Sequence, residues 1–343
     1  MSFDYRGLIE TMKRGLELGG RYAALEVTSE TLALGFARRW PFRAGVFTNL
    51  SHDHLDAHGS PEHYFASKAQ LFHALPQGRG VAVVNGSDEA SELLFEVIPS
   101  GITKLAYGVP SRGTPCVELA ARATRVELGW DGTHATLELA PELGGGSFEL
   151  FTRAIGEHFA ENALAAFVTA VALGVPRDAA GAAIARATPP PGRFELVASE
   201  PHVVVDYAHT PDALRRTLAT AASLARGKVI AVFGAGGDRD RKKRPAMGAA
   251  TDAAARVVVT SDNPRREDPA AIAAAIVEAV PPGVETVVDL ERERAIRRAV
   301  LEAAPGDVVV IAGKGHETTQ TIGAEEKPFS DADVARRTHA ERR

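Results

Sequence analysis

The sequence has a single cysteine, Cys116, among its 343 residues. One cysteine excludes both an internal disulfide and a cysteine-rich zinc site. No apolar run approaches the roughly 18 residues that a membrane-spanning helix needs. The first six residues lack a basic segment followed by an apolar one, so we expect no signal peptide. These absences favour a cytoplasmic protein that does not enter a membrane.

The sequence also lacks a strong excess of either charge. Its 39 Lys and Arg residues against 44 Asp and Glu residues give a net charge of -5, which provides no electrostatic reason to bind nucleic acid or an acidic membrane. The composition is 45% hydrophobic and 24% charged, as in soluble globular proteins. At roughly 100–200 residues per domain, the length predicts about two domains. We expect a monomer.

The second half of the sequence alternates apolar strand-like runs with helical stretches. Such alternation indicates an α/β fold with a mostly parallel sheet that is covered on both faces. The predicted strands are 203–207, 229–233, 257–260, 284–288 and 308–311, and the predicted helices are 212–225, 246–254, 269–279 and 291–303. The segment Pro189–Arg193 should separate two domains, which we place at 1–194 and 195–343.

The first half predicts a parallel sheet together with a small antiparallel sheet. Apolar runs predict strands at 22–27, 44–48 and 81–85, and alternating segments between 103 and 153 predict antiparallel strands. Helices are expected at 5–19, 30–39, 61–75, 88–95, 160–173 and 178–186. Glu26 would end the strand at 22–27, where a carboxylate is costly unless it has a partner. Glu26 is therefore a candidate site residue rather than a structural one.

The stretch 48–59 contains three histidines and two aspartates directly after a predicted strand, and Lys68 follows it. Ligands of α/β proteins bind at the carboxyl ends of strands, and imidazole and carboxylate groups there can hold a divalent metal with a nucleotide phosphate. An ordinary hydrophilic loop before a helix is the alternative. The stretch alone does not decide between them.

Three loops of the second half also follow predicted strands. Residues 234–245 combine glycines with five basic residues, and residues 313–317 form a Gly-Lys-Gly loop that resembles a phosphate grip but lacks P-loop spacing. In the loop 261–268, Asp262, Asn263 and Arg265 could bind a zwitterion. Asp268 before Pro269 should cap a helix, and Thr210 should cap another.

Together these motifs resemble the Mur ligase family, and within it the MurE type. The matching segments are 26–29 (Glu-Val-Thr-Ser), 48–59, 67–68, 192–195 (Gly-Arg-Phe-Glu), 206–212 (Asp-Tyr-Ala-His-Thr-Pro-Asp), 236–240, 262–265 (Asp-Asn-Pro-Arg) and 313–317 (Gly-Lys-Gly-His-Glu). The resemblance implies an incomplete central ATPase-type domain and a Rossmann-like C-terminal domain. It also implies an ATP-dependent amide ligase of peptidoglycan synthesis, which adds meso-diaminopimelate to UDP-N-acetylmuramoyl-L-Ala-D-Glu through an acyl phosphate.

The resemblance also implies roles for individual residues, with ATP and Mg²⁺ as cofactors. The expected catalytic and magnesium-binding residues are Glu26, His54 and Lys68, the last as a carbamate, because an ammonium has no lone pair for a metal. The expected nucleotide-binding residues are Asn162, Arg193, Asp206 and His209. The incoming amino acid is expected at Arg239, Asp262, Asn263, Arg265, Gly313 and Glu317, and the nucleotide-peptide substrate at Thr28 and Ser29.

The sequence departs from the family in its first part. The UDP-binding domain and the P-loop that holds ATP phosphates are not among its residues. We therefore expect little ATP-driven catalysis from this chain, and the simplest explanation is that Met1 is an internal methionine of a longer protein. A catalytically inactive fragment that binds nucleotide or amino acid is a competing hypothesis. A dehydrogenase is a weaker one, because Asp238-Arg239-Asp240 replaces the end of a dinucleotide-binding fingerprint.

A second departure concerns the acyl substrate. Leu34 and Phe36 stand where the family has the Gln and Arg that help to hold the nucleotide-peptide, and His158-Phe159 stands where Phe-Asn is usual. Replacing Arg by Phe removes a bidentate anion donor. A related amide ligase with a different acyl substrate is therefore an alternative.

Overall fold

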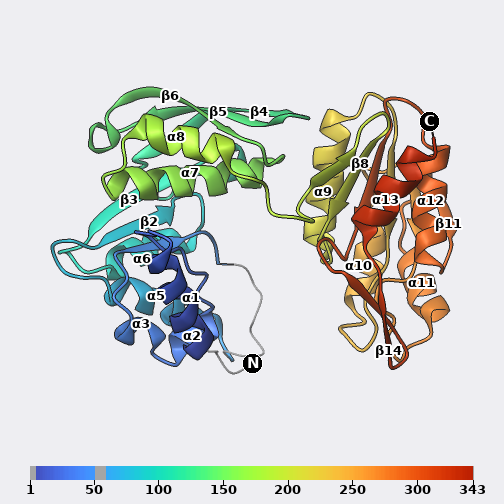
Figure 1. The fold of residues 1–343 in the computed structure, drawn as a ribbon, viewed down its shortest axis with the longest axis horizontal. Coiled ribbons are helices and arrows are strands. Elements are labelled where there is room, and N and C mark those ends of the chain that lie inside the picture. The colour runs from blue at the N-terminus through green and yellow to red at the C-terminus, as the bar shows by residue number, and fades with distance from the viewer. Residues whose placement is uncertain (1–4, 51–58, 343) are drawn as a thin grey trace. The chain divides into compact units, whose positions relative to one another are not determined.

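The computed structural model describes residues 5–50 and 59–342 (Figure 1). The chain divides into two compact units. The first comprises Met1–Val126, Ala135–Leu150 and Ala160–Ile184, and the second comprises Glu127–His134, Phe151–Phe159 and Ala185–Arg343. The predicted domain boundary after residue 194 stays a prediction. Within the described ranges, no helix is both long enough and apolar enough to cross a membrane.

The first sheet has the strand order β1-β2-β3-β4-β5-β6. Its strands are β1 (Ala44–Phe47), β2 (Val81–Asn85), β3 (Thr103–Gly108), β4 (Ala121–Gly129), β5 (Gly132–Leu139) and β6 (Gly146–Thr152). β1, β2 and β3 pair in parallel, and β4 joins β3 through only two residue pairs. The turn Trp130-Asp131 between β4 and β5 is too short for a parallel connection. The predicted antiparallel strands therefore continue the parallel sheet instead of forming a separate one.

Helices of the first half lie close to their predicted ranges. They are α1 (Tyr5–Glu17), α2 (Ser29–Ala33), α3 (Phe36–Arg39), α5 (Pro61–His73), α6 (Ala90–Val97), α7 (Glu157–Ala172) and α8 (Arg177–Arg186), with short 3-10 turns at Pro110–Arg112 and Pro141–Leu143. The single helix expected at 30–39 is split, because Gly35 adopts a left-handed φ of +79° between α2 and α3. α5 starts where its proline predicts, with the Ser60 hydroxyl accepting from the His63 amide.

The strand predicted at 22–27 is wrong. These residues form neither strand nor helix, and Tyr22 is 71% exposed. An apolar run becomes a strand only if it pairs with a neighbouring strand and buries its side chains. β1 is an edge strand of the sheet as described, with Val46 38% exposed, and residues 22–27 do not pair with it. Glu26 is consequently an exposed side chain and not the buried end of a strand.

The second sheet has the order β11-β10-β9-β12-β8-β7. Its strands are β7 (Glu195–Ala198), β8 (His202–Asp206), β9 (Val229–Phe233), β10 (Arg256–Val259), β11 (Glu285–Val288) and β12 (Val308–Ala312). All neighbours pair in parallel except β7, which is antiparallel to β8. The order reverses between β9 and β12, which is the switch point where α/β sheets bind ligands. The predicted α/β class is confirmed.

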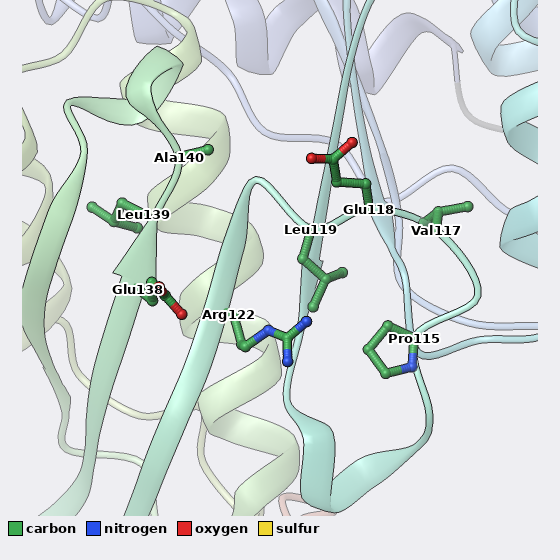
Figure 2. Close-up of a pocket in the computed structure, with 8 residues that line it drawn as sticks. All are labelled: Pro115, Val117, Glu118, Leu119, Arg122, Glu138, Leu139 and Ala140. Carbon is green, nitrogen blue, oxygen red and sulfur yellow. The ribbon is translucent and has the colours of Figure 1, made fainter.

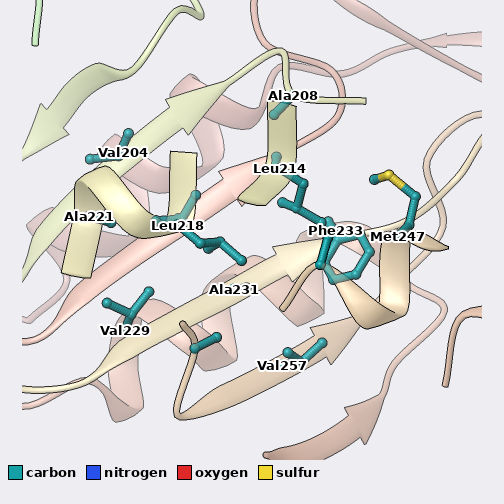
Figure 3. Packing of buried hydrophobic residues seen from close by; sticks show 14 of the residues in the cluster. Val204, Ala208, Leu214, Leu218, Ala221, Val229, Ala231, Phe233, Met247 and Val257 are labelled. Carbon is teal, nitrogen blue, oxygen red and sulfur yellow. The ribbon is translucent and has the colours of Figure 1, made fainter. Parts of the chain in front are cut away.

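Helices cover both faces of the second sheet. They are α9 (Pro211–Leu224), α10 (Lys243–Ala249), α11 (Pro269–Val277), α12 (Arg292–Glu302) and α13 (Asp331–Ala340). Successive strand residues point to opposite faces: Val204 packs with Leu214 and Leu218 of α9, whereas Val203 belongs to the cluster that contains Ile296 of α12. Figure 3 shows the first of these cores. Two buried faces explain why these strands are almost continuously apolar.

Four elements of the second half were not predicted. They are β7, the hairpin of β13 (Thr319–Ile322) and β14 (Glu325–Pro328), and helix α13. The sequence from Arg336 onward is mostly polar, yet most of these residues belong to α13. That helix buries Val334 and Ala335 against the sheet core while its arginines face outward. The apolar face is only a few residues wide, so its helical pattern is weak in the sequence.

Candidate functional site

In the first unit, the start of the candidate metal-binding stretch is held by three side chains, two from the end of β2 and the turn after it and one from α5. Asn85 at the end of β2 donates to the Thr48 carbonyl over 2.8 Å. Lys68 of α5 donates to the Asn49 carbonyl over 2.9 Å, and Asp88 accepts from the Leu50 amide over 2.8 Å. These three side chains therefore fix the path of the chain as it leaves β1. They lie at the carboxyl end of the strands, where α/β sheets bind ligands.

Lys68 lies in an aromatic and partly buried environment. Its Nζ is 5.0 Å from the centre of the Tyr64 ring and 5.9 Å from that of Phe47. Burial lowers the pKa of Lys68, and the charge of Asp88 opposes this shift only in part. A lowered pKa increases the fraction of neutral amine, which is the form that reacts with CO₂ to give a carbamate.

The three predicted metal ligands are not brought together by the described residues. His54 lies outside the part of the chain that the structure describes, and Glu26 is exposed in an irregular segment. Within residues 5–50 and 59–342, no group of three or more His, Cys, Asp or Glu could hold a metal ion. The predicted Mg²⁺ site, which needs His54 and the amine of Lys68, is not tested by the described residues, and its ligand set stays a prediction.

Next to this edge, Glu161 of α7 links two further polar residues. Its carboxylate accepts from Arg112 over 3.2 Å and from Asn85 over 3.5 Å. Neither Asp88 nor Glu161 was among the predicted site residues. Asn162, a predicted nucleotide ligand, follows Glu161 and is exposed.

The residues expected to bind the acyl substrate have local structural contacts. The Thr28 hydroxyl caps α2 by accepting from the Thr31 amide, and Ser29 is buried. Leu34 is 88% exposed, and the Phe36 ring stacks on Trp40 with centroids 5.9 Å apart. Leu34 and Phe36 are thus apolar at the two positions expected to carry Gln and Arg, while Arg38 and Arg39 of the same short helix as Phe36 are exposed.

A pocket of about 450 Å³ lies elsewhere in the first unit (Figure 2). The loop Pro115–Leu119 and strands β4 and β5 form its walls, and Glu118, Arg122 and Glu138 supply charges of both signs. None of its lining residues is a predicted site residue, so it is separate from the candidate site.

In the second unit, two loops meet at the switch point of the sheet. Asp262 and Asn263 follow β10 and are buried, and Gly313 follows β12. Gly313 has a φ of +114°, and a Cβ at this position would lie 2.5 Å from Asp262 Oδ2. Glycine is therefore required at 313 both by its backbone conformation and by the approach of this carboxylate.

A lysine that the resemblance did not assign organises this site. Lys314 is fully buried, and its Nζ donates to Glu317 Oε2 over 2.8 Å and to Asn263 Oδ1 over 3.2 Å. Asn263 also donates to Glu317 over 3.0 Å. Burial alone would raise the pKa of Glu317, but the hydrogen bonds and nearby cations outweigh it, so the pKa is lowered. Although the Gly-Lys-Gly loop resembles a phosphate grip, Lys314 is not exposed to a ligand, because its side chain is fully buried between these partners.

The two arginines of the predicted amino-acid site differ in their settings. Arg265 has a left-handed φ of 53°, unusual for a residue with a side chain, and its guanidinium donates to the Gly237 carbonyl over 2.7 Å. Arg239 is exposed in the loop after β9. Between these loops, Glu267 accepts from Arg244 and from the Asp238 amide, which lowers its pKa to about 2.

The predicted nucleotide ligands of the second unit surround Tyr207. The Arg193 guanidinium lies 4.4 Å from the centre of the Tyr207 ring, and the His209 ring packs against its edge at 4.6 Å. Asp206 is buried and accepts from the amides of Phe194 and Ala208 and from the Thr217 hydroxyl. Burial raises the pKa of Asp206 even though these hydrogen bonds lower it. Asp206 thus has a clear structural role in holding the segment at 194.

Sequence reasoning missed Lys314, Arg292, Gln320, Tyr207, Asp88 and Glu161. Nothing in the local sequence indicates that Lys314 is buried, because its partner Asn263 lies in another loop. Arg292 begins a predicted helix, and nothing in its local sequence indicates a buried guanidinium. Gln320, which donates to the Asp262 carbonyl over 2.7 Å, lies in the unpredicted hairpin.

Comparison with known families gives two matches along the chain. The Mur ligase middle domain matches residues 2–170, and the Mur ligase glutamate ligase domain matches residues 192–315. The chain is 42% identical over 331 residues to the UDP-N-acetylmuramoyl-L-alanyl-D-glutamate–2,6-diaminopimelate ligase of Synechococcus elongatus, covering 95% of the chain and 64% of that protein. It is 38% identical over 330 residues to the enzyme of the same name from Aquifex aeolicus, with the same two coverages. The chain thus spans less than two thirds of the length of these relatives.

Solved structures agree with this result. A structure of UDP-N-acetylmuramoyl-L-alanyl-D-glutamate–2,6-diaminopimelate ligase superposes with a TM-score of 0.71 at 33% identity, covering 98% of this chain and 68% of that one. The crystal structure of UDP-N-acetylmuramate-alanine ligase MurC from Thermotoga maritima gives a TM-score of 0.64 at 19% identity, covering 91% of this chain and 62% of that one, which shows the shared fold. This chain belongs to the Mur ligase family, and the segments it contains are the middle and C-terminal domains.

Proposed function

We propose that this chain carries the amino-acid-binding part of an ATP-dependent ligase that joins meso-diaminopimelate to UDP-N-acetylmuramoyl-L-Ala-D-Glu through an acyl phosphate. The observation that supports it most is the meeting of Asp262, Asn263, Arg265 and Glu317 at one switch point. Relatives of about 40% identity are named as ligases for 2,6-diaminopimelate. Peptidoglycan synthesis and a cytoplasmic location follow from this proposal.

The chemistry of the site fits an amino acid with two zwitterionic ends. The carboxylates of Asp262 and Glu317 can each accept from an ammonium group, and a guanidinium can pair with a carboxylate through two parallel hydrogen bonds. Meso-diaminopimelate has a second carboxylate that lysine lacks, and Arg265 is the residue we assign to it. Arg239 and the Gly313 backbone complete the proposed contacts.

ATP and Mg²⁺ belong to the proposal through family membership. We keep Asn162, Arg193, Asp206 and His209 as proposed nucleotide ligands, and Glu26, His54 and carbamylated Lys68 as proposed magnesium ligands. Because the described residues do not gather a metal site, we assign no step of the reaction to the metal.

Binding of the amino acid tests the proposal directly. Isothermal titration calorimetry of this chain should detect meso-diaminopimelate and give at least about tenfold weaker binding for L-lysine, which cannot form the second carboxylate pair. Arg265→Ala should remove this preference. Arg266→Ala is the matched control, because Arg266 is the next residue along and its side chain is exposed. Equal affinities for the two amino acids, or no binding, would contradict the proposal.

A second candidate function is an amide ligase with a different acyl substrate, favoured by exposed Leu34 and stacked Phe36. Phosphate release with ATP, Mg²⁺ and meso-diaminopimelate should be compared between UDP-N-acetylmuramoyl-L-Ala-D-Glu and other carboxylate acceptors. Turnover only with another acceptor would favour this candidate. Amino-acid binding without any turnover would favour an inactive binding fragment.

A further inference from the structure

Arg292 forms a fully buried ion pair at the start of two helices. It is the first residue of α12, and Asp331 is the first residue of α13. Its Nε donates to Asp331 Oδ1 over 2.8 Å and its Nη2 donates to Oδ2 over 2.7 Å, with both side chains 0% exposed. The guanidinium is thereby fixed in plane and orientation.

The remaining donors of Arg292 reach two backbone carbonyls. Nη1 donates to Ser261 O over 3.3 Å and Nη2 donates to Ala312 O over 3.0 Å. Ser261 directly precedes Asp262, and Ala312 directly precedes Gly313. The strands that lead to these residues, β10 and β12, are not neighbours, because β9 lies between them. One side chain thus connects the two loops that the sheet itself does not join directly.

Stability alone does not account for an arginine at this position. The first turn of a helix disfavours a cation, since the macrodipole is positive there. A buried ion pair is often no more stable than well-packed apolar residues of the same volume. What apolar residues cannot supply is a donor to each of the two carbonyls.

We infer that Arg292 is a positioning residue that sets the relative placement of Asp262 and Gly313 for amino-acid binding. Asp331 orients the guanidinium of Arg292. Gln320 also holds the loop after β10, because its side chain donates to the carbonyls of Ser261 and Asp262. This inference rests on the proposed function for the identity of the ligand, but its effect on the loops does not depend on that ligand.

The test compares two arginine-to-lysine variants on the same pair of helices. Arg292→Lys keeps the charge but cannot reach Asp331 and both carbonyls at once. Arg297→Lys is the matched control, because Arg297 of α12 also makes a bidentate pair, with Glu341 just after α13, but both side chains are partly exposed. Arg292→Met combined with Asp331→Leu removes both buried charges together, in case the single variant does not fold.

Two measurements are made on each folded variant, with circular dichroism confirming the fold. Affinity for meso-diaminopimelate should fall by about tenfold or more in Arg292→Lys, because small displacements of binding groups are costly, and by less than about twofold in Arg297→Lys. Hydrogen exchange without ligand should quicken at the amides of 261–263, 265 and 313–317 in Arg292→Lys and in the double variant, but not in the control.

Affinity tests the proposed function, and hydrogen exchange tests the positioning role of Arg292, so the two claims can fail separately. If the unaltered chain does not bind meso-diaminopimelate, the proposed function fails, and hydrogen exchange alone decides the role of Arg292. Unchanged exchange of both loops in the folded Arg292 variants would overturn the inference. A loss of thermal stability with unchanged affinity and exchange would also overturn it, since Arg292 would then only fasten α12 to α13.

Discussion

Lys314 Nζ lies 2.8 Å from Glu317 Oε2, and the lysine side chain is 0% exposed whereas that of the glutamate is 35% exposed. The cation of this pair is inside the protein and the carboxylate reaches the surface. The pair is therefore arranged to present an ionised carboxylate to a ligand, and the amide of Asn263 adds a second donor behind it.

Lys314→Met should make amino-acid binding more sensitive to acid. The pKa of Glu317 is lowered in the folded chain, so its ionised form contributes stability that is present above its unfolded pKa and is lost as the pH falls through the folded pKa. Removing Lys314 raises the folded pKa, so this loss begins at a higher pH. Titration of meso-diaminopimelate between about pH 3 and 7, around the ordinary Glu pKa of about 4.3, should show the acid limb of binding shifted upward.

Lys327→Met is the control for that titration, because Lys327 pairs with Glu325 over 3.3 Å while both side chains are exposed. In Lys327→Met, affinity for meso-diaminopimelate should fall at the same acidic pH as in the unaltered chain. An unshifted limb in Lys314→Met would show that this lysine does not maintain the charge of Glu317.

Gly313→Ala should weaken amino-acid binding and destabilise the fold. The left-handed backbone costs an alanine about 1–3 kcal/mol, and its Cβ would also have to displace Asp262 Oδ2. Gly283→Ala separates the two effects, since Gly283 has a φ of +96° but nothing within 4 Å of the added Cβ. Urea denaturation should show a larger loss at 313 than at 283, and calorimetry should show a loss of affinity only at 313. Equal losses of stability would mean that the Asp262 carboxylate can move aside.

Lys68 should react reversibly with CO₂ once neutral. Its lowered pKa supplies the amine lone pair at a lower pH than for a solvated lysine. Incubation with ¹³C-bicarbonate should give a carbamate resonance in the ¹³C spectrum that disappears in Lys68→Arg. Lys104→Arg is the comparison, because Lys104 also lies over an aromatic ring, that of Phe95. A carbamate signal that survives Lys68→Arg would assign the modification to another residue.

Asp206→Asn should destabilise the chain by about 1–3 kcal/mol, because the side-chain NH₂ would face at least one buried donor that the carboxylate now satisfies. The raised pKa of Asp206 adds a dependence on pH: the favourable contribution is present below the unfolded pKa and is lost as the pH rises through the folded pKa. Urea denaturation at several pH values should show that this dependence disappears in the variant. Asp212→Asn, in the exposed first turn of α9, should change little.

Much of the second unit was predictable because its strands are buried on both faces. Continuous valine and isoleucine runs such as 308–311 leave few alternatives, and the predicted caps at Thr210 and Asp268 are confirmed. The loops at the switch point could be named because parallel strands place their carboxyl ends together, whereas Gly313 and Glu317 were named only from the resemblance to the Mur ligase family. Local sequence was sufficient where burial and backbone direction decide the structure.

The rest depends on partners that are distant in the sequence. Residues 22–27 form an apolar run of strand length, but a strand also needs a neighbour to pair with, and the run itself does not reveal one. The guanidinium of Arg292 is buried only because Asp331 and the carbonyls of Ser261 and Ala312 surround it. The loop 313–317 resembles a phosphate grip because glycines flank Lys314, whereas the partners of this lysine in the fold are the side chains of Asn263 and Glu317.

Three side chains, those of Asn85, Lys68 and Asp88, anchor the backbone of residues 48–50, and this has a consequence for how the chain tolerates mutation. Each anchor is one hydrogen bond, from Asn85 at the end of β2, from Asp88 in the turn after it, or from Lys68 of α5, and contributes about 0.5–1.5 kcal/mol, or up to about 3 kcal/mol where the side chain is charged. Losing Asn85, Lys68 or Asp88 singly leaves two bonds to hold the segment, so its geometry should degrade in steps. Because the other two hydrogen bonds remain, the amine of Lys68 can be modified without releasing the backbone of residues 48–50.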